Sequence, residues 1–359
     1  MKTKKIKLAI IFGGRSAEHE VSVISARNIL KAIDKKKYII TLVGIDKKGN
    51  WLSFNQRELL KEDGEMFAKK DLNNLVIPFS KDGKFYLQIG NKNKNIEVVF
   101  PVLHGPFGED GTIQGLFKLY NVPFVGPGVL GSSVAMDKDV AKKLFKEAGL
   151  PIGKFVSFNS SDKNKIVFSE IKNILGLPFF IKPANLGSSV GISKVKDEKE
   201  FKKALKLAFD HDNKIVIEEF IDGKEIECAV LGNENPQAST VGEIIPTHDF
   251  YSYEAKYLDE DGAKMKIPAD ISKDLIKEFQ KLSIKAFQTL NCEGISRVDF
   301  FLTEDNKIYI NEINTIPGFT SISMYPKLWE ASGLSYTKLI DKAIKLAMDR
   351  HKKENKLKN

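Results

Sequence analysis

One segment, residues 294–314, strongly constrains the fold because its apolar and charged residues alternate as they do on a β-hairpin. In its first half, apolar residues fill every second position, and Arg297 and Asp299 lie between them. A second strand is predicted over 307–314, after a two-residue turn at 305–306. The segment is therefore predicted to be an antiparallel hairpin with one apolar and one charged face.

This register places Asp299 opposite Glu312 and Arg297 opposite Asn314. Directly opposed side chains lie about 5 Å apart at Cβ, where two carboxylates repel each other. A divalent cation would remove that repulsion, and oxygen ligands beside an arginine suit a Mg²⁺ ion that holds phosphate groups. Asp299, Glu312 and Asn314 are therefore candidate metal ligands, and the alternative is a solvent-facing hairpin with scattered charges.

The composition is that of an ordinary globular protein, and 359 residues suffice for two or three domains. Two cysteines are too few for a disulfide framework, and the apolar run at 8–12 is too short for a signal peptide. We therefore expect a cytoplasmic protein without a membrane segment. The net charge of +9 comes from lysines spread along the chain without interleaved aromatic residues, so no nucleic-acid partner is expected.

Strands and helices are predicted to alternate in the first third of the chain, which indicates an α/β domain with a parallel sheet. The polar stretch 61–95 is interpreted as an insertion whose role the sequence does not disclose. The turn at 126–128 suggests that an N-terminal domain covers residues 1–127. Strands are expected at 8–12, 38–45 and 98–103, with a helix at 17–33.

The rest of the chain is predicted to divide into a central domain, 128–222, and a C-terminal domain, 223–359. Asp137 is expected to cap a helix that ends before Gly149. A polar, tyrosine-containing stretch is interpreted as a lid within the loop region 241–268. Further strands are expected at 179–182, 215–220 and 225–231, and helices at 272–290 and 336–348.

Two lysines at the ends of predicted elements are candidates for binding phosphate. Lys182 ends a strand and precedes the small-residue loop 183–191, whose backbone N–H groups and hydroxyls can face phosphate oxygens. Lys138, at the start of a helix, is a second candidate cation. Residues 218–221 together with Glu225 could line an adenosine pocket. A lysine at a strand end is common, so each signal alone is weak.

Glu18 and His104 both follow predicted strands. Glu18 lies in the first turn of a helix, after a strand and two glycines, which makes it a candidate ligand for a substrate ammonium. The glycine spacing of a dinucleotide loop and the Lys-Ser/Thr of a P-loop are both missing there. His104 lies in a glycine-rich loop, where a histidine more often makes a structural hydrogen bond than takes part in catalysis.

Together, these segments resemble the ATP-grasp family and, within it, the D-alanine–D-alanine ligases. The resemblance runs in order through nearly the whole chain, and no motif residue departs from the family pattern. Any one motif would only be suggestive, but the whole series in the correct order is very specific. The motifs are GGRSAEHEVS, HGPFGEDGTIQG, MDK, FIKPANLGSSVGISKV, EEFIDGKEIE, YEAKY, RVDFF and NEINTIPGFTSIS.

The resemblance implies an ATP-grasp fold, in which two domains clasp ATP between them, and a role for each matched residue. ATP would be bound by Lys138, Lys182, Ser189, Glu218, Glu219, Phe220, Ile221, Glu225 and Asn311. Two Mg²⁺ ions, replaceable by Mn²⁺, would be bound by Asp299, Glu312 and Asn314. Substrate binding and catalysis would involve Glu18, Ser188, Lys256, Tyr257, Arg297, Gly318 and Ser323, and His104 would orient the substrate.

The reaction that the resemblance implies joins two D-alanine molecules for peptidoglycan precursor synthesis. The carboxylate of one D-alanine would attack the γ-phosphate of ATP, and the amine of the second would displace phosphate from the resulting D-alanyl phosphate. A homodimer is implied as well. Two alternatives stay open. One is a ligase that makes D-alanyl-D-lactate, whose family members carry phenylalanine where this chain has Tyr257 or replace that segment altogether, and the other is a catalytically silent nucleotide-binding protein.

Overall fold

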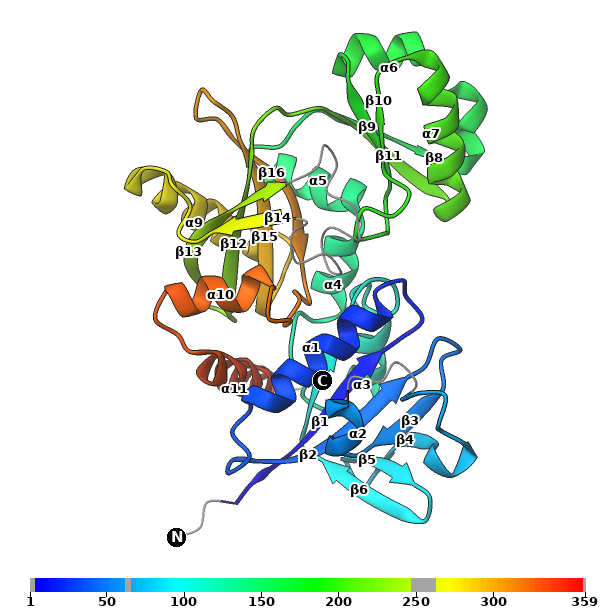
Figure 1. Ribbon diagram of the computed structural model, residues 1–359, viewed down its shortest axis with the longest axis vertical. Helices are drawn as coiled ribbons and strands as arrows, with labels where there is room; N and C mark the ends of the chain where they lie inside the picture. Colours follow the sequence, from blue (N-terminus) through cyan, green and yellow to red (C-terminus); the bar gives the residue numbers. More distant parts are fainter. Residues whose placement is uncertain (1–3, 62–65, 247–262, 358–359) are drawn as a thin grey trace.

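The structure is a computed structural model that describes residues 4–61, 66–246 and 263–357. Its elements form three bodies along the long axis of the molecule (Figure 1). The N-terminal body lies at one end, a small four-stranded sheet with its helices lies at the other, and a five-stranded sheet lies between them. The predicted mixed α/β architecture is confirmed.

A four-stranded sheet in the order β3-β2-β1-β7 forms the centre of the N-terminal body. The predicted parallel pairing is confirmed, because β1 pairs in parallel with both β2 and β7, while β3 is an antiparallel edge strand. The parallel strands are almost continuously apolar because both faces of the sheet are covered. The strands are β1 (Ile6–Gly13), β2 (Tyr38–Ile45), β3 (Trp51–Phe54) and β7 (Val98–Val102).

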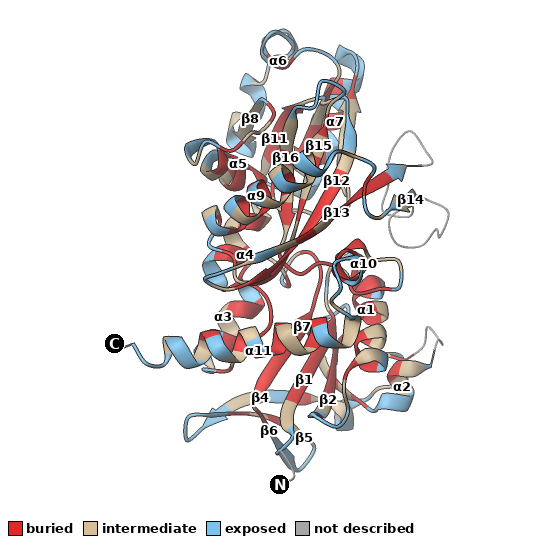
Figure 2. Cartoon of the chain, turned by 90° about the vertical axis from the view of Figure 1, so that its left-hand side faces the viewer, coloured by how far each residue is buried: buried red, intermediate tan, exposed pale blue. Residues whose placement is uncertain are grey.

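The two faces of this sheet have different covers. One face packs against α1 (His19–Ala32) and α11 (Tyr336–Glu354), so the last helix of the chain closes the N-terminal body (Figure 2). The other face packs against α3 (Thr112–Leu119) and an antiparallel sheet, β4-β5-β6, which the 61–95 insertion largely builds. Phe85 of this small sheet is buried in the shared core, so the insertion acts as a cover. Its strands are β4 (Val76–Lys81), β5 (Lys84–Ile89) and β6 (Lys92–Ile96), and α2 (Gln56–Leu60) and the 3-10 helix η1 (Leu72–Asn74) precede them.

The central sheet, in the order β10-β9-β11-β8, is antiparallel and packs against α6 and α7. Asp137 caps α5 as predicted, because its side chain accepts hydrogen bonds from the backbone N–H groups of Asp139 and Val140. The helices are α4 (Val129–Met136), α5 (Lys138–Glu147), α6 (Phe168–Leu175), α7 (Glu198–His211) and the 3-10 helix η2 (Ser160–Lys165). The strands are β8 (Phe155–Asn159), β9 (Phe179–Pro183), β10 (Ser193–Val195) and β11 (Lys214–Glu219).

The C-terminal sheet, in the order β14-β13-β12-β15-β16, is antiparallel throughout. One face packs against α9, and α10 packs against the other. Residues 247–262, which hold most of the predicted lid with Lys256 and Tyr257, lie outside the described residues. The elements are β12 (Lys224–Gly232), β13 (Gln237–Pro246), β14 (Ala263–Lys266), α9 (Lys273–Thr289), β15 (Gly294–Leu302), β16 (Ile308–Asn314) and α10 (Met324–Ala331).

The β15–β16 hairpin has the predicted pairs at its charged end, but the predicted two-residue turn is wrong. The strands pair Leu302 with Ile308, which leaves a longer loop. This loop shifts the pairing of the two strands by one residue from the predicted register. A β-bulge beside Asp299, with Asn311 as the extra residue on β16, restores the predicted pairs at the charged end. A bulge redirects side chains locally, and Asn311 and Glu312 both line the same cavity.

Candidate active site

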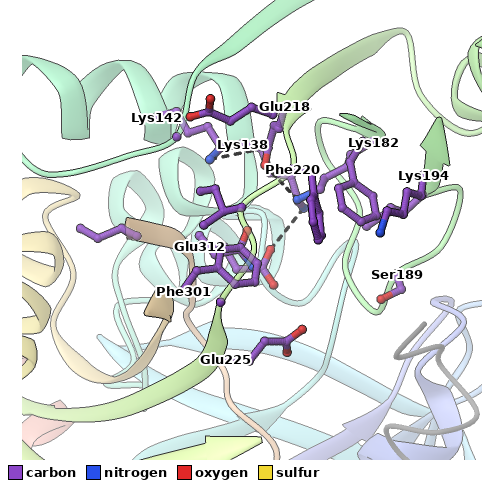
Figure 3. A pocket seen from close by; sticks show the side chains of 18 of the residues that line it. Lys138, Lys142, Lys182, Ser189, Lys194, Glu218, Phe220, Glu225, Phe301 and Glu312 are labelled. Atoms are coloured by element: carbon purple, nitrogen blue, oxygen red, sulfur yellow. Dashed lines mark hydrogen bonds and ion pairs between the residues drawn. The ribbon is translucent and has the colours of Figure 1, made fainter. Parts of the chain in front are cut away.

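A cavity of about 230 Å³ lies between the central and C-terminal sheets (Figure 3). Polar side chains reach it from α5, β9, the end of β11 and β16. All the residues predicted to bind ATP line this cavity: Lys138, Lys182, Ser189, Glu218, Glu219, Phe220, Ile221, Glu225 and Asn311. Residues from distant parts of the sequence are therefore brought together in one place.

Buried lysines form the polar wall of the cavity (Figure 3). Lys138 Nζ donates a hydrogen bond to Leu186 O at 2.6 Å and lies 3.6 Å from a Glu312 carboxylate oxygen. Lys182 Nζ donates to Glu218 Oε2 at 2.9 Å. Buried ammonium groups need such partners, and a polyanionic ligand could supply them as well.

Lys142 is a further buried cation at this wall, and sequence patterns alone did not reveal it. It lies one helical turn after Lys138 on α5, and its Nζ is 3.5 Å from Glu218 Oε1. The i, i+4 spacing was the available signal. Burial lowers the pKa of Lys142, and the Glu218 charge offsets only part of this effect. Burial alone would raise the pKa of Glu218, but Lys142 and Lys182 outweigh it and lower that pKa to about 2.

The other end of the cavity carries an aromatic ring and the end of a strand. The ammonium of Lys194 lies 3.9 Å from the ring centroid of Phe220. Glu219 Oε1 accepts a hydrogen bond from the backbone N–H of Lys154 at 2.7 Å, which fixes the chain just before Phe220. An aromatic surface beside exposed backbone groups suits a planar heterocycle.

Arg297 links two carboxylates of the C-terminal sheet, those of Asp299 and Glu227. Its Nε and Nη2 donate to the two oxygens of Asp299, both at 2.7 Å, and its Nε lies 2.9 Å from Glu227 Oε2. The Asn314 amide donates to Asp299 Oδ2 at 2.8 Å. Within the part of the chain that the structure describes, no group of three or more His, Cys, Asp or Glu side chains is placed to hold a metal ion. The predicted set needs only two carboxylates, those of Asp299 and Glu312, and the amide oxygen of Asn314. Asp299 lies directly opposite Glu312, and Asn314 follows Glu312 by two positions on β16. Oxygen donors of this kind suit Mg²⁺, so the residues fit this ion.

Glu18 lies where three loops meet. Ser188 Oγ donates a hydrogen bond to Glu18 Oε1, and the Glu18 side chain is buried. Gly105 has φ of +72°, a left-handed backbone that favours glycine, and a Cβ atom there would lie 2.7 Å from Glu18 Oε2. Ser188 and Ser189 both have left-handed backbone, with φ of +53° and +60°. Tyr257, which the resemblance also assigns to substrate binding and catalysis, lies outside the described residues.

His104 is buried and uncharged at neutral pH. Its Nδ1 lies 2.9 Å from Ile316 O, and its Nε2 lies 3.3 Å from Ser25 Oγ. Burial lowers the pKa of His104 to about 4. The ring therefore connects the loop after β7 to the segment after β16.

Glu109 makes a second connection between these segments, and no sequence pattern indicated it. Its carboxylate accepts hydrogen bonds from the backbone N–H groups of Gly105 and Ile316, at 2.8 and 3.0 Å. Burial and the charge of Glu18 raise the pKa of Glu109 to about 8. The HGPFGEDGTIQG motif contains Glu109, but nothing in the motif shows which segment it contacts.

Gly318 and Ser323 lie close together after β16. Ser323 Oγ accepts a hydrogen bond from Thr320 N at 2.9 Å, and Ser323 immediately precedes α10. A Cβ atom on Gly318 would lie 2.6 Å from Ser323 Oγ, so a larger residue there would have to displace the Ser323 hydroxyl. The backbone N–H of Phe319 donates to Ser25 Oγ at 3.1 Å, which anchors the turn to α1.

Two antiparallel sheets that enclose a lysine-lined cavity define the class of this protein, which has the ATP-grasp fold. Two family models cover most of the chain: the D-ala D-ala ligase N-terminus matches residues 7–127, and the D-ala D-ala ligase C-terminus matches residues 144–345. The chain therefore belongs to the D-alanine–D-alanine ligase family.

Individual relatives agree with this assignment. The chain is 52% identical to a D-alanine–D-alanine ligase of Oceanobacillus iheyensis over 99% of this chain and 98% of the relative. It is 49% identical to D-alanine–D-alanine ligase A of Escherichia coli, with 99% of each chain covered. The structure of the D-alanine–D-alanine ligase from Coxiella burnetii is similar, with a TM-score of 0.89, 39% identity and coverage of 99% of this chain and 97% of that one. VanG D-Ala:D-Ser ligase from Enterococcus faecalis has a TM-score of 0.85 and 38% identity, with coverage of 96% of this chain and 100% of that one.

Among the described residues, no helix combines the length and the apolar character that crossing a bilayer requires.

Proposed function

We propose that this protein joins two D-alanine molecules at the expense of ATP. The observation that carries the proposal is that loop 186–189 touches both halves of the site. Leu186 O binds Lys138 at the cavity, whereas Ser188 binds Glu18 in the N-terminal body. A nucleotide in the cavity and an amino acid at Glu18 would therefore lie on either side of one short loop, as transfer of a phosphoryl group between them requires.

The proposed reaction has two steps. The carboxylate of the first D-alanine attacks the γ-phosphate of ATP, which gives D-alanyl phosphate and ADP. The amine of the second D-alanine then attacks the acyl carbon, and phosphate leaves. Lys138 and Lys182 would hold the phosphates of ATP, since anion–anion attack needs charge neutralisation. Arg297 and the backbone N–H of Gly318 would stabilise the oxyanion of the tetrahedral intermediate.

The ends of the two amino acids would be held by different groups. Glu18 is a buried carboxylate and would bind the ammonium of the first D-alanine. Ser323, at the start of α10, would bind the carboxylate of the second. His104 is neutral and both of its ring nitrogens have protein partners, so it would orient the substrate indirectly, by holding Ser25 and the backbone at Ile316 in place. Lys256 and Tyr257 are proposed to close the site as parts of a lid and to exclude water from the acyl phosphate.

The nucleotide would lie along the remaining lining residues. Ser189 would bind phosphate, the backbone of residues 218–221 would face the adenine, and Glu225 would accept hydrogen bonds from the ribose hydroxyls. Asp299, Glu312 and Asn314, with Asn311 beside them, would hold two Mg²⁺ ions or Mn²⁺ in their place. When bound, these ions would supply the positive charge that the phosphate oxygens need.

A homodimer is also proposed. Leu119 on α3 is 86% exposed, and Val129 and Leu130 at the start of the adjoining α4 are exposed as well, so this side carries an apolar surface that a second copy could cover. Light scattering should give a dimer, and Leu119→Asp should give a monomer; a monomeric wild type would reject the dimer. A cytoplasmic location is proposed because ATP is the energy source.

The function is tested by measuring phosphate release and identifying the products by mass. The purified protein is supplied with MgATP and with D-alanine, L-alanine, D-serine or D-lactate, singly and in pairs. D-Alanyl-D-alanine should be the main product. Predominance of a mixed dipeptide with D-serine, or of a depsipeptide with D-lactate, would assign a different second substrate. ATP binding without any product would indicate a silent nucleotide-binding protein.

A further inference from the structure

Glu227 is a buried carboxylate beside the predicted metal ligands, and the roles proposed above leave it unused. It is 8% exposed and lies on β12 directly opposite Asp299 on β15. Asp299 in turn lies opposite Glu312 on β16. The three carboxylates therefore occupy one row across three strands. The Cβ atoms of neighbours in such a row lie about 5 Å apart, so the carboxylates repel each other unless cations lie between them.

Arg297 supplies positive charge within this row and has two carboxylate partners. It donates to both oxygens of Asp299 at 2.7 Å, and its Nε lies 2.9 Å from Glu227 Oε2. A two-pronged contact of this kind is among the strongest that an arginine makes. In this arrangement the guanidinium donates to both oxygens that Asp299 would offer to a metal ion.

Metal binding at Asp299 Oδ2 would therefore compete with the hydrogen bonds that this oxygen accepts. Oδ2 accepts from both Arg297 and Asn314, so it can coordinate a cation only if it gives up one of these donors. A divalent cation would also repel the guanidinium. Arg297 is largely buried, so losing every carboxylate partner would be costly.

We propose that Glu227 is a positioning residue that retains Arg297 when Asp299 turns to a metal ion. The proposal rests on the metal role proposed above for Asp299. Glu227 lies on the opposite side of Asp299 from Glu312, so it draws the guanidinium away from the gap between Asp299 and Glu312. On the other neighbouring strand, β13, the residue directly opposite Glu227 is Gly242, which has no side chain to contact the Glu227 carboxylate.

The test is the affinity for Mn²⁺, measured by electron paramagnetic resonance in the presence of ADP. Glu227→Gln keeps the shape of the side chain but removes its charge, so Arg297 should hold Asp299 more firmly. Mn²⁺ should then bind about tenfold more weakly, which is the scale of one charge-assisted contact. The matched control is Glu293→Gln, which removes a carboxylate 3.6 Å from Arg350 just before β15 and should leave Mn²⁺ affinity unchanged.

A second arm shows whether the effect passes through Arg297. In an Arg297→Met background the competing cation is absent, so adding Glu227→Gln should leave Mn²⁺ affinity unchanged. An equal loss in both backgrounds would overturn the proposal, and so would unchanged affinity in the single variant. If Glu227→Gln fails to fold, Glu227→Asp replaces it, because the shorter carboxylate reaches Arg297 less well. That variant should show a smaller loss of affinity, and no loss would overturn the proposal.

Failure of this proposal can be told apart from failure of the proposed function. A wild-type protein that binds no Mn²⁺ would reject the metal ligands themselves. Normal Mn²⁺ binding by the wild type, with unchanged affinity in Glu227→Gln, would reject only the role of Glu227. Dipeptide synthesis by the wild type is measured separately and does not depend on either variant.

Discussion

Replacing Glu218 by Gln tests whether one carboxylate stabilises two buried lysines beside the cavity. Lys182 Nζ and Lys142 Nζ lie 2.9 and 3.5 Å from its oxygens, and Glu218 is 7% exposed. A fall of its pKa from an ordinary 4.5 to about 2 corresponds to about 3 kcal/mol in favour of the charged form in the folded protein. Glu218→Gln should therefore lower the free energy of unfolding at neutral pH by about 3 kcal/mol, the scale for removing one partner of a buried pair.

The pH dependence makes this prediction specific. Because the folded-state pKa of Glu218 lies below the unfolded value, its contribution is present above about pH 4.5 and is lost as the pH falls towards 2. Urea unfolding should show wild type and Glu218→Gln furthest apart near neutral pH and converging in acid. The matched control, Glu219→Gln, removes a carboxylate that accepts a backbone N–H at 2.7 Å, and its difference from wild type should be smaller. Parallel curves for wild type and Glu218→Gln would refute the reasoning.

Four further predictions concern binding and turnover. Lys182→Ala should weaken ATP binding by about 1.5 to 3 kcal/mol, the range for a charge-assisted contact, and unchanged affinity by calorimetry would remove Lys182 from the site. Glu312→Gln should nearly abolish turnover because its carboxylate is proposed to help hold the two metal ions, and a folded variant with normal rates would rule this out. Glu18→Gln should raise the apparent KM for the first D-alanine while ATP affinity stays nearly constant; an equal KM would exclude Glu18 as the ammonium ligand. Tyr257→Phe should increase depsipeptide relative to dipeptide from mixed D-lactate and D-alanine, and an unchanged product ratio would reject its proposed role in specificity.

The charged face of the hairpin could be predicted because strand periodicity is a local property. A period of two residues fixes which side chains share a face, so Arg297 and Asp299 were placed correctly from the sequence. The turn could not be predicted in the same way, because a longer loop combined with a bulge at Asn311 produces the same pairs at the charged end as a two-residue turn does. Asn306, with φ of +60°, lies in the longer loop.

Contacts between distant segments were not predictable from local patterns. Glu109 accepts the backbone N–H of Ile316, which lies 207 positions away in the sequence. The predicted last helix ended too early, at residue 348, whereas α11 continues to Glu354. The lysine-rich sequence at its end resembles a solvated tail, and the contacts that bury part of it involve distant residues. Arg350 near that end is buried and donates to Gly126 O and Phe124 O, at 2.7 and 2.9 Å. Only the folded arrangement shows that this charged residue has backbone partners inside the protein.

Loop 186–189 suggests how the two substrates would influence each other. Ser188 and Ser189 occupy left-handed backbone, and a residue other than glycine pays about 1–3 kcal/mol for such a conformation. The contacts from Leu186 to Lys138 and from Ser188 to Glu18 hold the loop in place. ATP phosphates would compete for Lys138, and a substrate ammonium would compete for Glu18. Since both ligands act on contacts of the same loop, the binding of each should change the affinity for the other, and thermodynamic linkage requires that change to be equal in both directions.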